Sequence, residues 1–258
     1  LNNGRGDGLT TASAYAVNPS NAADGTSFTS GVIGMSIGQS INCVWKSSGA
    51  VYCWGLGTYG LADGTANASS IPVASSVLSS GVTKVSTGAN FGCAIKSGRP
   101  YCWGAASVYQ GGDSGSGILL TPTARTQLPT SDYLDVSSDS SSSCYLKAYA
   151  VVCTGSNSNG SFGNGLTTGG GSTAYVHTTG VLASGITSLY GVSNNSQIRC
   201  FGTATQSVYC AGQNYYGLVP GTTGDVNGQQ YAPILSSYTK VSSIASNQLN
   251  ATAGTGCL

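Results

Sequence analysis

The nine cysteines are the residues of this chain with the clearest chemical potential. Eight of them form four pairs whose members lie 9 or 10 positions apart: Cys43 and Cys53, Cys93 and Cys102, Cys144 and Cys153, Cys200 and Cys210. Zinc sites use tight ligand pairs such as Cys-x2-Cys, and the sequence has no such pair and a single histidine, His177. The spacing therefore favours disulfides over metal binding, and we expect neither metal ligands nor a cofactor.

Each cysteine pair has the separation of a disulfide across a β-hairpin. If Cys93 and Cys102 lie directly opposite each other, Ser97 and Gly98 form a two-residue turn, with glycine where a positive φ is needed. The first pair likewise leaves a three-residue turn ending in Gly49. The third pair leaves Ala148-Tyr149, a poor turn sequence, which predicts a distorted hairpin.

The ninth cysteine, Cys257, has no partner at the same spacing, because position 266 lies beyond the last residue. Three interpretations stay open. A terminal stretch that carried its partner is not included, or Cys257 bonds a second chain, or ring closure by strands from both ends leaves it free. The phase of the repeats relative to both termini favours the first of these, and an unpaired cysteine in a secreted chain is the signal for the second.

The sequence contains few residues that could act as general acids or bases. His177 has no nucleophile or acid pair near it, and all eight acidic residues are Asp. Asp132, Asp135 and Asp139 lie close together in the sequence, but an exposed strand and turn explains them equally well, and the calcium-loop pattern is absent. We therefore expect no catalytic residues and no enzyme activity.

The composition restricts the architecture that positions these side chains. Charged residues make up 7% of the 258 residues and the net charge is +1, whereas ordinary domains are about 25% charged. Helix-rich folds are disfavoured because Glu is absent and the 39 Gly residues are costly in helices. The charge also disfavours nucleic-acid binding, and 15 Tyr with many aliphatic residues argue against disorder.

The sequence around the cysteines repeats with a period of 50 to 57 residues. The stretch 81–88 before Cys93 has counterparts at 31–38 and 185–192, and Trp-Gly follows the second cysteine at Trp54 and Trp103. A Gly-rich turn and a strand start centred on proline come next. The approximate repeats are 1–55, 56–104, 105–155, 156–212 and an incomplete 213–258.

Each repeat reads as three or four short strands, and no repeat can bury both its faces alone. We therefore predict an all-β fold in which about five repeats stack around an axis as a β-propeller, with one hairpin disulfide per blade and a single domain over 1–258. A linear β-solenoid is the structural alternative.

The runs 93–104 and 51–65 resemble the regulator-of-chromosome-condensation repeat, and more closely its secreted, cysteine-bearing version in bacterial and algal surface proteins. The resemblance covers essentially the whole chain and implies a β-propeller, commonly seven-bladed. The founding member's exchange activity on a small GTPase depends on an inserted wedge and on basic arms, neither of which is evident here. A second branch, the propeller-type β-lactamase inhibitory proteins, uses the scaffold as a pure binding module.

Nine cysteines and low charge favour an oxidising, extracellular or cell-surface location. Four Asn-x-Ser/Thr patterns are candidate glycosylation sites, at Asn67, Asn159, Asn194 and Asn250. No run of about 18 apolar residues predicts a membrane span. We expect a non-enzymatic structural or interaction module, a glycosylated subunit of a surface assembly, coat or filament, with other protein subunits, its own copies and glycans as partners. The alternatives are a soluble lectin or protein inhibitor and, less favoured, a polysaccharide-active enzyme.

Overall fold

The computed structural model describes residues 6–9, 21–105, 117–128, 130–148, 150–167, 170–176, 184–191 and 198–212. It also describes the backbone of short strands at 235–236, 245–247 and 255–257. Among these residues the only helix is a single 3-10 turn, η1 (Gly57–Tyr59), so the predicted all-β class is confirmed.

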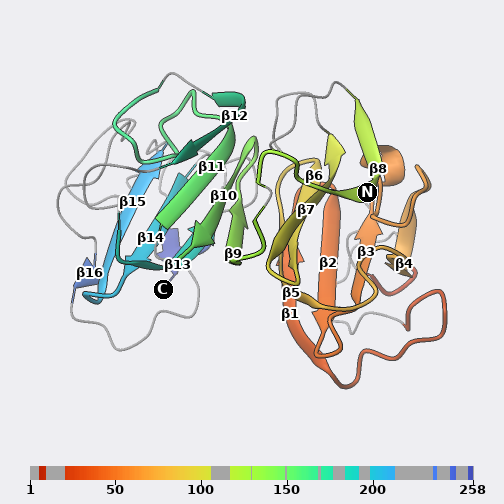
Figure 1. Cartoon of the computed structure of the whole chain (residues 1–258). Helices are drawn as coiled ribbons and strands as arrows, with labels where there is room; N and C mark the ends of the chain where they lie inside the picture. Colours follow the sequence, from red (N-terminus) through yellow and green to blue (C-terminus); the bar gives the residue numbers. More distant parts are fainter. Residues whose placement is uncertain are drawn as a thin grey trace.

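Sixteen strands form four antiparallel sheets of four strands each, in chain order (Figure 1). Sheet 1 consists of β1 (Val32–Ile37), β2 (Ile41–Lys46), β3 (Val51–Gly55) and β4 (Ser69–Ala74). Sheet 2 consists of β5 (Val82–Thr87), β6 (Phe91–Lys96), β7 (Arg99–Ala105) and β8 (Ile118–Ala124). Sheet 3 consists of β9 (Tyr133–Ser138), β10 (Ser142–Lys147), β11 (Ala150–Ser156) and β12 (Gly170–Val176). Sheet 4 consists of β13 (Ile186–Gly191), β14 (Ile198–Thr203), β15 (Ser207–Gly212) and β16 (Leu235–Ser236).

Beyond sheet 4 a two-stranded hairpin pairs β17 (Ala245–Asn247) with β18 (Thr255–Cys257). The first strands of sheets 1 to 4 contact one another in succession, β1 with β5, β5 with β9 and β9 with β13. The sheets therefore share an inner row of first strands, while each fourth strand lies at the opposite edge. This is the arrangement of propeller blades around an axis.

The hairpins have the register that the cysteine spacing predicts. Cys93 lies opposite Cys102 and Lys96 opposite Arg99, and the turn residues Ser97 and Gly98 have φ of 50° and 76°. The distortion expected in the third hairpin is wrong. Its strands stay in register up to the pair of Lys147 with Ala150, because Ala148 itself adopts a φ of 40°.

A disulfide joins the two middle strands of every four-stranded sheet. The paired Cα atoms lie 4.0 to 4.1 Å apart, and all eight cysteines are buried. A cross-strand bridge at this position fixes the hairpin that carries most of each sheet's core.

Replacing Cys93 and Cys102 together with Ala is expected to lower the free energy of unfolding by about 2–3 kcal/mol, because each bridge closes a short loop of the unfolded chain. Thermal unfolding followed by circular dichroism measures the loss. Exchanging the exposed pair Ser47 and Ser48 for Ala serves as the control. An unchanged midpoint in the cysteine variant would contradict the assigned role.

The sheets are out of phase with the sequence repeats. The predicted repeats end just after the second cysteine of each pair, whereas each sheet begins at its inner strand and ends beyond the next Gly-rich turn. Consequently the proline of each turn-strand unit lies inside an outer strand rather than at its start, as Pro72 in β4 and Pro122 in β8 show. An outer strand tolerates proline because one side of it needs no ladder hydrogen bonds.

The core lies between the sheets. One cluster packs the disulfide Cys43–Cys53 of sheet 1 against Val82 and Val85 of sheet 2, and Trp103 joins it. Corresponding clusters join sheet 2 to sheet 3 and sheet 3 to sheet 4. We call the side of a sheet that packs on the preceding sheet its leading face, and the side that carries the disulfide its trailing face.

Candidate functional site

Hydroxyl and carboxylate groups tie each inner strand to the next. Ser36 Oγ accepts a hydrogen bond of 2.9 Å from the backbone N–H of Thr87, and Ser86 Oγ accepts one of 2.8 Å from the backbone N–H of Ser138. At the next junction the bond comes from a different position, because Asp135, two residues before the serine equivalent Ser137, accepts from the backbone N–H of Leu189 at 3.4 Å. These bonds fix the register between neighbouring sheets near the axis.

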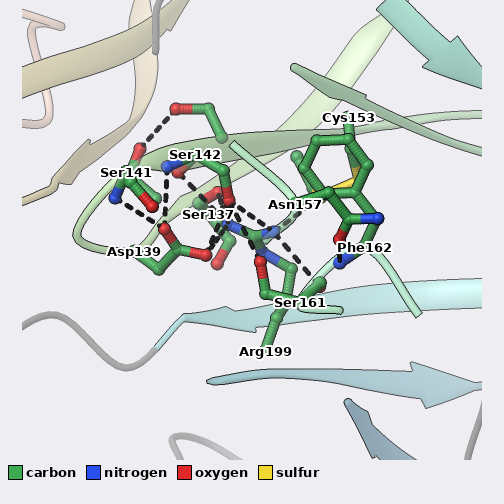
Figure 2. A network of polar contacts seen from close by, with 12 residues as sticks. Ser137, Asp139, Ser141, Ser142, Cys153, Asn157, Ser161, Phe162 and Arg199 are labelled. Atoms are coloured by element: carbon green, nitrogen blue, oxygen red, sulfur yellow. Dashed lines mark hydrogen bonds and ion pairs between the residues drawn. A yellow bond between two sulfur atoms is a disulfide. The ribbon is translucent and has the colours of Figure 1, made fainter. Parts of the chain in front are cut away.

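A buried ion pair reinforces the junction between sheets 3 and 4 (Figure 2). Arg199 of β14 reaches into sheet 3, where its Nη2 lies 3.2 Å from Asp139 Oδ2, and both side chains are 0% exposed. Asp139 follows β9, and its Oδ1 accepts hydrogen bonds from the backbone N–H groups of Ser141 and Ser142 at 2.8 and 2.7 Å. Backbone hydrogen bonds within the turn between β9 and β10 therefore position the Asp139 carboxylate that pairs with Arg199.

The remaining guanidinium contacts are also polar. Arg199 donates from Nη1 to Cys144 Sγ at 2.8 Å and from Nη2 to the carbonyl oxygen of Ser137 at 3.2 Å. Burial lowers the pKa of Arg199, and Asp139 opposes that shift by favouring the charged form. The charges of Arg199 and Asp139 face each other and neighbouring polar groups of the chain. The geometry therefore supports a buried ion pair that holds sheets 3 and 4 together, which we call the buried lock, rather than a ligand site.

The three clustered aspartates face three different cations. Asp132 lies 3.2 Å from Lys147 Nζ, Asp135 lies 3.3 Å from Lys84 Nζ, and Asp139 binds Arg199. The structure therefore does not bring them together as a catalytic pair or as calcium ligands. Within the described ranges no three His, Cys, Asp or Glu side chains gather as metal ligands.

Asp132 offers a test of this placement by titration. A hydrogen bond with the Thr130 side chain, followed by Lys147, lowers the pKa of Asp132 below its ordinary value of 3.8. Any stability that the carboxylate contributes is therefore present above that value and is lost as the pH falls below it. We expect Thr130→Val to raise the pKa more than Lys147→Met does, as measured by carboxyl carbon NMR shifts. The reverse order would contradict the assignment.

Three lysines occupy one repeated position, the last residue of the second strand in sheets 1 to 3. Lys46, Lys96 and Lys147 each follow the first cysteine of a pair by three residues. Their Nζ atoms lie 5.7 to 5.9 Å from the ring centres of Phe28, Tyr101 and Tyr133, respectively. The three ammonium groups therefore stand at the hairpin-turn end of successive sheets. Sequence reasoning missed this row, although the constant spacing was available to find it.

The inner strand of sheet 1 is exposed and apolar. Val32, Ile33, Met35 and Ile37 are 38 to 60% exposed, and β1 carries no charged residue. Composition and motif analysis gave no sign of this surface, because the residues have the same apolar character as their buried counterparts in later sheets.

The candidate glycosylation sites differ in their placement. Asn67 is exposed in the connection before β4, whereas Asn159 is half-buried in a turn whose Ser161 is buried. Asn194, Asn250 and His177 lie outside the described residues, as does the side chain of Cys257. Within the described residues, no helix has the length and apolar character needed to cross a membrane.

Residues 48–95 match the family model of the regulator of chromosome condensation (RCC1) repeat. No curated protein sequence matches the chain. Among solved structures, human WBSCR16 is similar with a TM-score of 0.63 at 13% identity, over 77% of this chain and 51% of that protein. Prp20p from Saccharomyces cerevisiae is similar with a TM-score of 0.62 at 16% identity, over 83% of this chain and 53% of that chain.

Yeast RCC1 (Prp20) in its complex with Kap60 gives a TM-score of 0.61 at 13% identity, over 81% of this chain and 49% of that chain. The chain thus spans about half the length of these proteins. The matched segment runs from the hairpin turn of sheet 1 to β6 of sheet 2. The family's repeat therefore also begins in one sheet and ends in the next. With the four stacked sheets and their inner strands, the similar structures show that this chain has a β-propeller fold, and residues 48–95 within it match one RCC1 repeat.

Proposed function

We propose that this chain is an extracellular, non-enzymatic interaction module, a glycosylated subunit of a surface assembly such as a coat or filament. The observation that carries the proposal is the buried disulfide in each four-stranded sheet. Structural disulfides at this density are characteristic of oxidising compartments. The low content of charged residues, 7%, further favours association with other macromolecules.

An interaction role is consistent with the similar structures. One of them is yeast RCC1 bound to Kap60, and the study of Prp20p describes binding to Gsp1p and histones. Those partners belong to proteins of about twice the matched length, and the identities are at most 16%. The general use of the scaffold for binding proteins therefore supports our proposal, whereas the particular partners do not transfer.

The proposal is tested on protein purified from its natural source. We expect the protein in the extracellular or cell-wall fraction. Reduction followed by alkylation is expected to add the mass of eight alkyl groups, one for each cysteine of the four disulfides, and deglycosylation is expected to lower the mass. Asn67→Gln is expected to remove one glycan. Recovery from the cytoplasm with free thiols and no sugar would refute the proposal.

The row of Lys46, Lys96 and Lys147 favours a second candidate function, a soluble binding protein that recognises acidic glycans or acidic protein surfaces. The ammonium groups lie on successive sheets and could engage one extended anionic ligand.

A heparin-type glycan array provides the test of this second function. We expect the triple change of these lysines to Gln to abolish salt-sensitive binding, because it removes the three repeated charges. Lys84→Gln, which lies elsewhere and pairs with Asp135, is the matched control. Equal loss in both variants would show a nonspecific charge effect and reject the site.

A further inference from the structure

Among the described residues, the leading face of sheet 1 lacks the cover that sheets 2 to 4 have. On β5, Val82 and Val85 are 3 and 1% exposed because they pack on the disulfide of the preceding sheet. The equivalent residues of β9 and β13 are equally buried: Tyr133, Val136, Ile186 and Leu189. On β1 the same two positions are Val32 and Met35, which are 38 and 60% exposed.

The ladder registers establish this equivalence. Val32 pairs with Lys46 and Met35 with Val44, just as Val82 pairs with Lys96 and Val85 with Ala94. Both inner strands also have the same register shift after their first residue. The exposure of Val32 and Met35 therefore does not come from a different strand geometry. It comes from the absence of a preceding trailing face among the described residues.

The outer part of the same face is already covered. Ala22 and Phe28 pack on Val44, Tyr52 and Trp54. Gly6 approaches Trp54 so closely that a Cβ atom there would lie 2.9 Å from the indole. The uncovered part is the apolar stripe along β1, at the place where a neighbouring disulfide hairpin packs in the later junctions.

We propose that this stripe docks a second copy of the chain, head to tail, through the β17–β18 hairpin of the neighbour. The inference rests on the proposed function, which it deepens by specifying how subunits join. It continues the interface that the chain builds three times between its own sheets. In the repeat sequence Cys257 holds the first-cysteine position, and the first cysteine of sheet 1, Cys43, packs with Val82 and Val85.

The proposed contact is heterologous, because it joins a leading face to a trailing hairpin. In such an assembly the leading face of each copy contacts one neighbour and its hairpin contacts another. Unless the rotation closes, such a contact generates an open filament. The stripe itself carries no charge, and Lys46 lies opposite Val32 at its end, so assembly is expected to depend less on salt than binding through all three lysines.

Crosslinking tests the proposal in the full chain. Met35→Cys places a thiol on the stripe, and mild oxidation is expected to produce a ladder of multimers on a non-reducing gel through bonds to Cys257 of neighbouring copies. Leu134→Cys, which is at an equally exposed position on β9 (64%), is the matched control and is expected to give no ladder. Met35→Cys combined with Cys257→Ser is also expected to give none.

The other outcomes overturn the proposal. A faster-migrating monomer would show that the face is closed within one chain. A dimer that persists without Cys257 would show a symmetric contact between two stripes, and no crosslinked species would show an unoccupied face.

Sedimentation provides a readout that does not depend on thiols. Met35→Asp is expected to weaken self-association about tenfold or more, because it buries a charge in place of an apolar side chain, while the unfolding midpoint stays unchanged. Leu134→Asp is expected to leave association unchanged. A wild-type chain that is extracellular and glycosylated but monomeric would refute this inference and leave the proposed location intact. Assembly through β1 in a cytoplasmic, reduced protein would support this inference and refute the proposed extracellular location.

Discussion

Replacing Asp139 with Asn is expected to lower the free energy of unfolding by about 3–5 kcal/mol, because the change leaves the Arg199 guanidinium buried without a counter-charge. Arg199 and Asp139 are both 0% exposed, so water cannot replace the lost partner. Denaturant unfolding with the disulfides intact measures the loss.

Two further variants separate the buried charge from simple loss of packing. The double change Arg199→Met and Asp139→Asn is expected to recover much of the stability, because it removes both charges and keeps a side chain of similar length. Lys147→Met, which breaks an exposed ion pair with Asp132, is expected to cost less than about 1 kcal/mol. Equal losses for Asp139→Asn and Lys147→Met would contradict the assignment of a buried lock.

The sequence was sufficient to predict the hairpins because their geometry is local. Ten residues of chain contain both cysteines, the turn and the strand alternation, so the opposition of Cys93 and Cys102 follows from spacing alone. The distortion expected at Ala148 failed because alanine can adopt a left-handed conformation when the register of the flanking strands requires it. Turn propensity is a weak local preference, and the disulfide and ladder on either side outweigh it.

Contacts between residues that are far apart in the chain could not be predicted from local sequence. Asp139 and Arg199 are separated by 60 positions, and the repeats show glycine where Asp139 stands, at Gly38 and Gly88. The departure from the repeat was visible, but only the stacking of sheets shows that Arg199 compensates for it. Similarly, Met35 and Val85 are both apolar, and their different exposure depends on whether another described sheet packs on the strand that carries them.

A second buried feature depends on a match across two strands of one sheet. Gly92 lies directly opposite Trp103, and a Cβ atom on Gly92 would lie 2.3 Å from Trp103 Cζ2. The same two positions hold Ser143 and Thr154 in sheet 3, and Arg199 and Ala211 in sheet 4. In sheet 1 the pair is Asn42 and Trp54. The combination of a glycine with an indole is therefore particular to sheet 2, where the two residues fill one shared volume at the junction with sheet 1.

Trp103→Ala is therefore expected to cost about 3–5 kcal/mol, because it removes a buried indole that packs against sheet 1 and leaves a cavity. Unfolding in urea measures the loss. Ile118→Ala, at an exposed apolar position of the same sheet, is the control and is expected to change stability little.

The shared volume also predicts the sign of a double-mutant cycle. Gly92→Ala alone is expected to cost about 1–3 kcal/mol, because the indole must move to admit the methyl group. In the Trp103→Ala background the same change is expected to be neutral or stabilising, because the methyl group enters space that the indole has vacated. A cost for Gly92→Ala that is the same in both backgrounds would mean that the backbone, and not the indole, requires glycine at this position. A favourable coupling would mean that Gly92 and Trp103 fill one shared volume at the junction between sheets 1 and 2.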